Sequence, residues 1–199
     1  MTEQARPDST ARLGATPAGT GRYTAQPAGP DATVGRFVSQ LDAAAAGPVA
    51  MRGMLGSASE ALADRFRNGD AVELLAAANA GIVDAALTHL WAQFDVPEND
   101  FTLIAVGGYG RAELHPGSDI DILILIAEGE IDTDPVERFV AALWDTGLEI
   151  GHSVRTVADC KAQAAEDVTI TTTLMESRRL VGNASLDEEM ARVTGPAHV

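Results

Sequence analysis

The apolar positions of this chain change their spacing near residue 97. Between residues 34 and 96 they recur every three or four positions, as on one face of an α-helix. Three helices are predicted there: the first ends at Gly47, the second ends near Asn68, and the third has Asp70 as its N-cap. We interpret residues 34–96 as an N-terminal helical segment. The third helix carries a wide apolar face, formed by Leu74, Leu75, Ala78, Ile82, Ala85, Ala86, Leu90 and Phe94.

Short apolar runs alternate with helical patterns in residues 97–199. Two of these runs are typical of buried strands, and the second, IDILILI, is apolar enough to be covered on both faces. The expected order is strands at 101–106 and 120–126, a helix at 134–146, a strand at 148–157, and helices at 158–165 and 167–181. These elements predict an α/β (α+β) fold: a small mixed β-sheet with flanking helices, beside the N-terminal helical segment. The helix at 134–146 is expected to turn inward Val136, Phe139, Val140, Leu143 and Trp144.

Composition separates the first 33 residues from the rest. Residues 1–33 consist mostly of Ala, Gly, Pro, Thr and Ser, and Leu13 and Tyr23 are almost their only bulky apolar residues. Such a segment buries too little surface to offset the entropy that ordering would cost. We therefore predict a disordered tail over residues 1–33.

Charge and cysteine content limit the partners that fit this chain. The formal net charge is −15, and the tail adds nothing to it because its three arginines balance its three acids. So acidic a surface repels nucleic-acid phosphates, and no basic stripe is visible. There is no run of 18 apolar residues and no secretory pattern, so no membrane partner is expected. A single cysteine, Cys160, fits a reducing cytoplasm, where we expect the protein to reside.

Two carboxylates at the start of the second predicted strand form a candidate metal site. Asp119 and Asp121 are two residues apart, so on a strand their side chains point to the same face. Neighbouring carboxylates repel each other unless a cation lies between them, and their oxygens suit Mg²⁺. Because strand ends often carry acids, the Asp-x-Asp pattern alone is weak evidence for a metal.

A glycine turn upstream strengthens this hypothesis. Gly107 and Gly108 directly follow the first predicted strand, and Gly108 precedes Asp119 by 11 residues. Glycines let the backbone approach phosphate oxygens closely, and the N-terminus of a following helix favours negative charge. Ser118 is a further candidate donor to phosphate. The alternative is a tight turn that needs glycine only for its backbone angles.

The whole run, GGYGRAELHPGSDIDILIL, closely resembles the catalytic signature of the bacterial protein-PII uridylyltransferases. These enzymes belong to the DNA polymerase beta-like nucleotidyltransferase superfamily. The downstream stretches GLEIGHSVRT and EDVTITTTLMESRRLVGN are also similar to this family, and the resemblance covers roughly residues 50–190. It implies a nucleotidyltransferase fold, a Mg²⁺ cofactor, UTP or ATP as the nucleotide, and the PII signal protein as the partner.

The resemblance also assigns roles to single residues. Asp119 and Asp121 match the family's metal-binding and catalytic pair, and Gly107 and Gly108 match its nucleotide-contacting turn. Arg111 is a candidate to neutralise triphosphate charge; the alternative is a salt bridge to Glu113 or another acid. The neighbouring Tyr109 is expected to pack near the site.

A third carboxylate, which many members of the superfamily use as a general base, is harder to assign. Alternation along the strand at 148–157 puts Glu149, Gly151, Ser153 and Arg155 on a polar face. If that face lies toward the site, Glu149 is the best third catalytic acid and Arg155 a nucleotide contact. Alignment of the VRT end with related nucleotidyltransferases puts Gly151 at the third acid's position instead. His152 and Asp167 are the other candidates, although Asp167 is better placed to cap a helix.

The predicted reaction is transfer of a nucleoside monophosphate, UMP or AMP, to a tyrosine of PII, with release of pyrophosphate. Family members continue into HD and ACT domains, which are not found here, so the chain is expected to be an N-terminal fragment. One alternative is a nucleotidyltransferase-like domain that binds nucleotide without catalysis. Another is a nucleotidyltransferase with a different acceptor, such as an antibiotic-modifying or toxin–antitoxin enzyme; ELHP and GLEIGHSVRT argue against it.

Overall fold

A computed structural model of the chain describes residues 31–44 and 46–195. Most of the predicted disordered tail, residues 1–30, lies outside the described residues. Its predicted end at residue 33 was two residues too late, because helix α1 (Ala32–Ala44) begins at Ala32. The Asp31 carboxylate accepts hydrogen bonds from the Thr33 and Val34 N–H groups at 2.8 and 3.3 Å, which is how an N-cap fixes a helix start.

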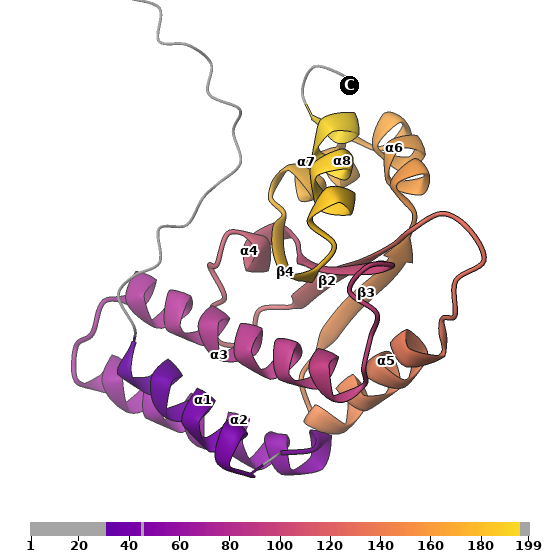
Figure 1. Cartoon of the computed structure of the whole chain (residues 1–199). Helices are drawn as coiled ribbons and strands as arrows, with labels where there is room; N and C mark the ends of the chain where they lie inside the picture. The colour runs from indigo at the N-terminus through magenta and orange to yellow at the C-terminus, as the bar shows by residue number, and fades with distance from the viewer. Residues whose placement is uncertain (1–30, 45, 196–199) are drawn as a thin grey trace, which may run out of the picture.

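Eight helices and four strands make up the described part of the chain (Figure 1). After α1 the N-terminal segment contains α2 (Pro48–Arg67) and α3 (Val72–Gln93). The remaining elements are β1 (Phe101–Ala105), α4 (Gly107–Gly110), β2 (Ile120–Ile126), α5 (Asp134–Thr146), β3 (Ile150–Arg155), α6 (Val157–Glu166), α7 (Val168–Met175), β4 (Arg178–Gly182) and α8 (Ala184–Thr194). The predicted helices at 34–96 and 134–146 are confirmed, as are the first three strands within a few residues.

The four strands form one mixed sheet in the order β3-β2-β1-β4. Strand β1 runs antiparallel to both of its neighbours, whereas β2 and β3 are parallel. Parallel neighbours need a crossover, which helix α5 provides between β2 and β3. The predicted α/β class with a small mixed sheet is therefore confirmed.

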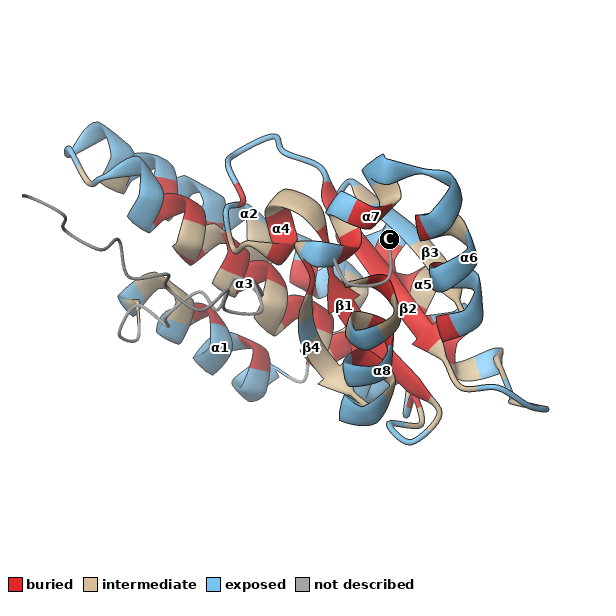
Figure 2. Ribbon diagram, turned by 90° about the horizontal axis from the view of Figure 1, so that it is seen from above, coloured by how far each residue is buried: buried red, intermediate tan, exposed pale blue. Residues whose placement is uncertain are grey.

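Helices cover both faces of this sheet (Figures 1 and 2). One face packs against α1, α2, α3 and α5 in a large apolar cluster that contains Ile120, Ile122 and Ile124 of β2. The other face packs against α6, α7 and α8 in a smaller cluster that contains Leu123 and Leu125. Strand β2 is therefore apolar at successive positions because it is buried on both sides, as its sequence predicted.

Helix α3 lies at the centre of the larger cluster. Ten of its residues are buried, and Trp91 meets Phe139 of α5 edge to face with ring centroids 5.1 Å apart. By length and composition α3 is the one described helix that could cross a membrane, but 56% of its most apolar window is buried inside this fold. A core helix passes the same test, and its packing against α1, α2 and α5 accounts for its apolar character.

Helix 167–181 was predicted too long, and two elements were missed. The helix ends at Met175, and Arg178–Gly182 forms strand β4, which pairs with β1 around an irregularity between Leu103 and Ile104. Helix α8 follows directly. Because β4 begins with two adjacent arginines, its sequence lacks the alternation of apolar and polar residues that predicts a strand. Its extended conformation therefore comes from pairing with β1 rather than from the preferences of its own residues.

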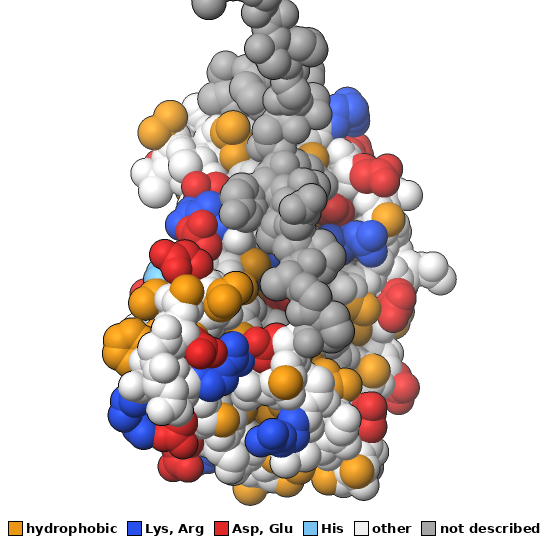
Figure 3. Space-filling view, turned by 90° about the vertical axis from the view of Figure 1, so that its left-hand side faces the viewer, with side chains coloured by type: hydrophobic (Ala, Val, Ile, Leu, Met, Phe, Trp, Pro, Cys, Tyr) orange, Lys and Arg blue, Asp and Glu red, His pale blue; other side chains and the backbone are white. Residues whose placement is uncertain are grey.

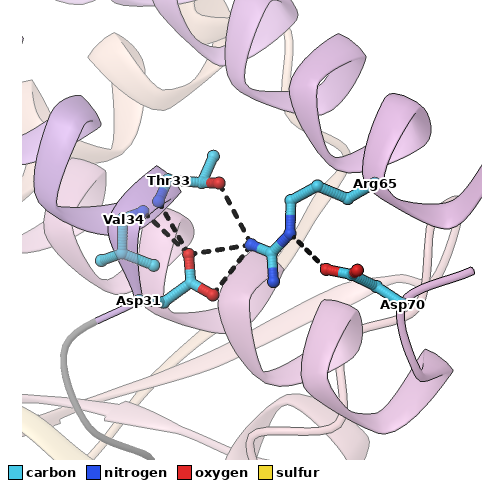
Figure 4. A network of polar contacts seen from close by, with 5 residues as sticks. All are labelled: Asp31, Thr33, Val34, Arg65 and Asp70. Atoms are coloured by element: carbon cyan, nitrogen blue, oxygen red, sulfur yellow. Dashed lines mark hydrogen bonds and ion pairs between the residues drawn. The ribbon is translucent and has the colours of Figure 1, made fainter. Parts of the chain in front are cut away.

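The third helix does not have the predicted N-cap. Its N-cap residue is Ala71, without a side-chain hydrogen bond, while the Asp70 carboxylate accepts from Arg65 Nε at 2.7 Å. Arg65 also donates from Nη1 to both Asp31 oxygens, at 3.0 and 2.8 Å, so one guanidinium joins two carboxylates (Figure 4). This network ties the start of α1 to the α2–α3 connection.

Trp144 is also placed differently from the prediction. On the amphipathic helix α5, Val136, Phe139 and Leu143 are buried as expected, but the Trp144 side chain is 70% exposed. The apolar stripe of α5 is therefore narrower than its sequence suggested, and Trp144 lies on its solvent side.

Candidate active site

The glycine turn connects β1 to the short helix α4. The Val106 N–H donates to the Asp121 carbonyl at 3.1 Å, which holds the start of the turn against the strand that bears the carboxylates. Gly107 has a φ of +60°, in the left-handed region where residues with a Cβ are strained. The first N–H groups of a helix have no intrahelical partner, so those of the turn are open to an anion. With only four residues, α4 adds little of the dipole that the sequence argument invoked.

The other glycines of the motif meet different constraints. A Cβ at Gly110 would lie 1.8 Å from the Glu176 carbonyl oxygen, so the packing of α4 against the α7–β4 connection requires glycine there. A Cβ at Gly108 would find its nearest atoms at 3.7 and 3.8 Å, which is ordinary contact. Neither backbone angle nor packing within the described chain demands glycine at 108, and its contact with a phosphate stays a prediction.

Asp119 and Asp121 lie where β2 begins, and both residues are exposed. Alternation puts Asp121 on the face of the sheet that Leu123 and Leu125 share, at the edge that α6–α8 leave open. Although the residue as a whole is exposed, partial desolvation of its carboxylate, and then the nearby charge of Asp119, raises the pKa of Asp121. Within residues 31–44 and 46–195 no ion pair includes either carboxylate, so the two like charges lack a cation from the protein.

Strand β3 brings Gly151 directly beside this pair. The parallel register pairs Gly151 with Asp121, and a Cβ at Gly151 would lie 2.5 Å from Asp121 Oδ1. Glycine therefore leaves the space in which the Asp121 carboxylate lies. In the described part of the chain, no group of three or more His, Cys, Asp or Glu residues is arranged to hold a metal. Position 151, at which the sequence alignment predicts a third acid, is thus adjacent to Asp121 and has no side chain.

Glu149 comes one residue before β3 and is close to the site through its backbone. Its carbonyl accepts a hydrogen bond from the Ile120 N–H at 3.3 Å, between the two aspartates in sequence, and its side chain is exposed. Because Gly151 pairs with Asp121, Glu149 lies next to the level of Asp119 on the neighbouring strand. Its role as the third acid stays a prediction that this placement allows.

Arg155 is not brought to the carboxylates. It pairs with Leu125, four positions along β2 from Asp121, which at about 3.3 Å per residue is roughly 13 Å away. Its charge acts instead at the start of α6, where it helps to lower the pKa of Asp159 after the hydrogen bonds from Thr156. Asp167 caps α7 by accepting from the Thr169 N–H at 2.7 Å, as its alternative role predicted.

Arg111 follows α4 and forms ion pairs with two acids. Its Nε donates to Glu113 at 2.8 Å and its Nη1 donates to Glu176. The hydrogen bond that Arg111 donates to Glu113 is the largest cause that raises the pKa of Arg111. The salt-bridge alternative is thus present in the structure, and a direct phosphate contact by Arg111 stays a prediction.

Ser118 ends the loop between α4 and β2, directly before Asp119. Its N–H donates to the His115 carbonyl at 3.0 Å across Gly117, which has a φ of +78°. The residue is exposed, as a phosphate donor must be.

A cavity lies beside these groups rather than around them. It has a volume of about 610 Å³ and opens between α2, α3 and the loop before β2. Ser118 and Glu149 belong to its lining, whereas Gly107, Gly108, Asp119 and Asp121 do not. The polar groups of the site are therefore open to solvent at the rim of an apolar cleft. On the face drawn in Figure 3, basic side chains lie next to acidic ones.

Sequence reasoning missed Asp84, Glu176 and Arg178, which contact α4 from distant parts of the chain. The one available signal was the stretch MESRR, which contributed to the family resemblance but had no assigned role. Tyr109, expected to pack near the site, is buried and bonded to Asp84.

Comparison with known proteins identifies the family that shares these features. A family described as “Putative nucleotidyltransferase DUF294” matches residues 54–166, more than half of the chain. This range contains the glycine turn, both aspartates and strand β3.

Curated relatives carry a more specific description. The bifunctional uridylyltransferase/uridylyl-removing enzyme of Pseudomonas putida (strain W619) is 46% identical over 168 residues, which cover 83% of this chain and 19% of that protein. Its counterparts in Pseudomonas fluorescens (strain SBW25) and Pseudomonas savastanoi pv. phaseolicola are 45% and 42% identical over the same shares. The chain thus spans about a fifth of the length of these relatives.

A likeness to one solved structure is weaker. A protein described as “Crystal structure of the toxin-antitoxin with AMP-PNP” matches 55% of this chain and 82% of its own, at 17% sequence identity and a TM-score of 0.35. At this level the likeness supports no conclusion about the chain.

Proposed function

This chain belongs to the DUF294 nucleotidyltransferase family, and we propose that it transfers UMP from UTP to a tyrosine of the PII signal protein, releasing pyrophosphate. One observation supports this most directly: the glycine turn is hydrogen-bonded to the strand that bears Asp119 and Asp121. A triphosphate on the turn would thus have its reacting phosphate close to the carboxylates. Identity of 46% to uridylyltransferases over most of the chain favours UMP, and AMP from ATP is the alternative.

The cofactor in this proposal is Mg²⁺. Asp119 and Asp121 supply the hard oxygen donors that it prefers, and the mutual repulsion that helps to raise the pKa of Asp121 is what a bound cation would relieve. When bound, Mg²⁺ neutralises phosphate charge and makes the acceptor hydroxyl more acidic.

The chain's own residues then divide the remaining tasks. The N–H groups of Gly107 and Gly108 hold the triphosphate, with Ser118 as a further donor. Glu149, exposed beside the level of Asp119, takes the proton of the acceptor hydroxyl. The pKa of a phenol is about 10, far below that of an aliphatic hydroxyl, so a tyrosine needs only a weak base. A site with glycine at position 151 suits such an acceptor.

We place this reaction in the cytoplasm. The one cysteine of the chain supports this location, since Cys160 is buried and free, and burial raises its pKa to about 11. So protected a thiol is a packing residue rather than half of a disulfide.

The test is transfer of label to purified PII. The full chain is incubated with PII, Mg²⁺ and UTP or ATP labelled in the α-phosphate, and PII is analysed for bound label. We expect label on PII with UTP, its loss when EDTA removes the metal, and its loss when the target tyrosine is changed to phenylalanine.

Two results would separate the alternatives. Binding of nucleotide without any transfer would support a non-catalytic nucleotide-binding domain, the reading that Gly151 favours. Transfer to another hydroxyl-bearing acceptor but not to PII would keep the reaction and refute the partner. An Asp64→Asn variant serves as the control, because Asp64 is an exposed residue of α2 that pairs only with Arg67 among the described ion pairs.

A further inference from the structure

A partly buried network holds the glycine turn from two distant elements. Tyr109 of α4 donates its hydroxyl to Asp84 Oδ1 of α3 at 2.6 Å. Arg178, the first residue of β4, donates to the same Asp84 carboxylate at 2.7 and 3.1 Å, one bond to each oxygen. One aspartate thereby joins a helix of the N-terminal segment, the turn and an edge strand.

Arg178 also binds the backbone of the turn. Its guanidinium donates to the carbonyls of Tyr109 and Gly110, both at 3.3 Å, and lies 5.6 Å from the centre of the Tyr109 ring. A guanidinium can do this because its five donors lie in one rigid plane; a lysine could not reach all of these acceptors together.

The segment before β4 closes the turn from the same side. Gly110 packs so tightly on the Glu176 carbonyl that no Cβ fits between them, and the Glu176 carboxylate pairs with Arg111. The turn is therefore fixed at its last two residues by direct contacts with Asp84, Glu176 and Arg178.

The network is partly shielded from water. Tyr109 is 1% exposed, and the Arg178 and Asp84 side chains are 23% and 28% exposed, so water competes little for their bonds. Desolvation and the Asp84 charge raise the pKa of Tyr109 well above its usual value, which keeps the hydroxyl a neutral donor. None of the three side chains is in the place where we put the triphosphate or the metal.

Resting on the proposed function, we propose that Asp84, Tyr109 and Arg178 are positioning residues that fix the turn Gly107–Gly110 at the angle required to bind the triphosphate. Donors that are already aimed cost no reorganisation when the ligand arrives. Loss of a supporting contact behind a binding group typically reduces affinity about tenfold or more. A network that served the fold alone would instead affect every property of the site equally.

The experiment compares two ligands that use different halves of the site. Binding of manganese(II) alone, measured by electron paramagnetic resonance, depends on the two aspartates. Binding of Mg·UTP, measured by calorimetry, depends on the glycine turn as well. The full chain is compared with Tyr109→Phe, which removes one hydroxyl, and with Arg178→Lys, which keeps the charge but loses the planar fork. Arg138→Lys is the matched control, because among the described ion pairs Arg138 takes part only in an exposed one with Asp134 on α5.

We expect both variants to bind Mg·UTP about tenfold more weakly, while manganese affinity and the midpoint of thermal unfolding of Tyr109→Phe stay close to those of the unaltered chain. Arg138→Lys should match the unaltered chain in every measurement. Unchanged Mg·UTP binding by a folded Tyr109→Phe would overturn the proposal, and so would an equal loss of manganese and Mg·UTP affinity. Failure of the unaltered chain to bind Mg·UTP would refute the proposed function itself. This outcome is distinct from those that would overturn only the positioning role of the network.

Discussion

Two pairs of aspartates in this chain have opposite electrostatic environments. Asp31 and Asp70 are joined by the Arg65 guanidinium, which donates to both at 2.7–3.0 Å (Figure 4). Burial opposes ionisation of Asp31, but the bond from Arg65 and those from the backbone outweigh it, so the pKa of Asp31 is lowered. At the other pair, burial and Asp119 act together, and the pKa of Asp121 is raised.

This difference in the carboxyl pKa values indicates which pair of aspartates stabilises the fold and which is available to a ligand. At the first pair the chain supplies its own cation from α2. At the second, Arg111 is the nearest arginine in sequence, and its charge is already taken up by Glu113 and Glu176. A carboxylate pair that the fold leaves without a counter-charge at an open strand end is where a cation from solution is expected.

The largest expected effect comes from breaking the second pair. Changing Asp119 or Asp121 to Asn removes the charge that holds the metal, and nucleotidyl transfer should fall by about 10²–10³-fold or more. The fold should persist, because neither carboxylate has an ion-pair partner in the described chain. Initial rates of labelled transfer, with circular dichroism of each variant, measure this, and retained activity would refute the metal assignment.

Removing the arginine that joins Asp31 and Asp70 should lower the stability of the fold and leave nucleotidyl transfer unchanged. Arg65→Gln leaves two partly buried carboxylates without their cation, and we expect a loss of about 1.5 kcal/mol in the free energy of unfolding, since solvent screens part of the interaction. Urea denaturation measures the loss. Arg67→Gln, which breaks an exposed pair, should change stability by less than about 0.5 kcal/mol; equal losses in both variants would contradict the comparison.

A smaller effect should follow from adding one carbon beside the second pair. In Gly151→Ala the new Cβ would occupy a point 2.5 Å from Asp121 Oδ1, so the carboxylate must turn away. We expect manganese affinity to fall about fivefold with little change in stability, because the displaced atoms end a flexible side chain. Gly53→Ala on α2, where a Cβ meets open space, is the control and should bind manganese normally.

The smallest effect is on the pH dependence of stability, and its sign should differ between the pairs. Ionised Asp31 stabilises the fold above its unfolded-state pKa, and this stability is lost as pH falls through the lowered folded-state pKa. Ionised Asp121 opposes folding, so its cost disappears as pH falls through the raised pKa. Urea denaturation between about pH 3 and 7 should show Asp31→Asn less stable and Asp121→Asn more stable than the unaltered chain, each by about 0.5 kcal/mol near neutrality. Both differences should shrink on acidification, and slopes of the same sign would contradict this.

Sequence patterns predicted the parts of the fold that depend on local periodicity. The buried strand Ile120–Ile126 and the helix Asp134–Thr146 have the predicted bounds, because continuous apolar runs and a 3.6-residue repeat leave few other conformations. Strand β4 has no such pattern, since Arg178 and Arg179 stand where alternation would show, and only its pairing with β1 makes it a strand.

The residues of the candidate site likewise fall into those that the sequence could predict and those that it could not. Its glycines and aspartates lie in one short stretch and were assigned from spacing and resemblance. The contacts that join Asp84, Arg178 and α4 to one another connect residues up to 94 positions apart, and no local signal reports such pairs. Exposure of Trp144 was missed for a related reason: how far an apolar stripe extends around a helix depends on the neighbour that covers it.

The hydrogen bonds from Arg178 to the carbonyls of Tyr109 and Gly110 also bear on the order in which the chain folds. Arg178 is 69 and 68 positions from Tyr109 and Gly110, so we expect their contact to form later than the hairpin of β1 and β2. On a ribosome, a nascent chain that has emerged only as far as β3 already contains the glycines, both aspartates and Glu149. Its turn still lacks Glu176 and Arg178, so competence to bind nucleotide tightly should arrive only with the emergence of β4.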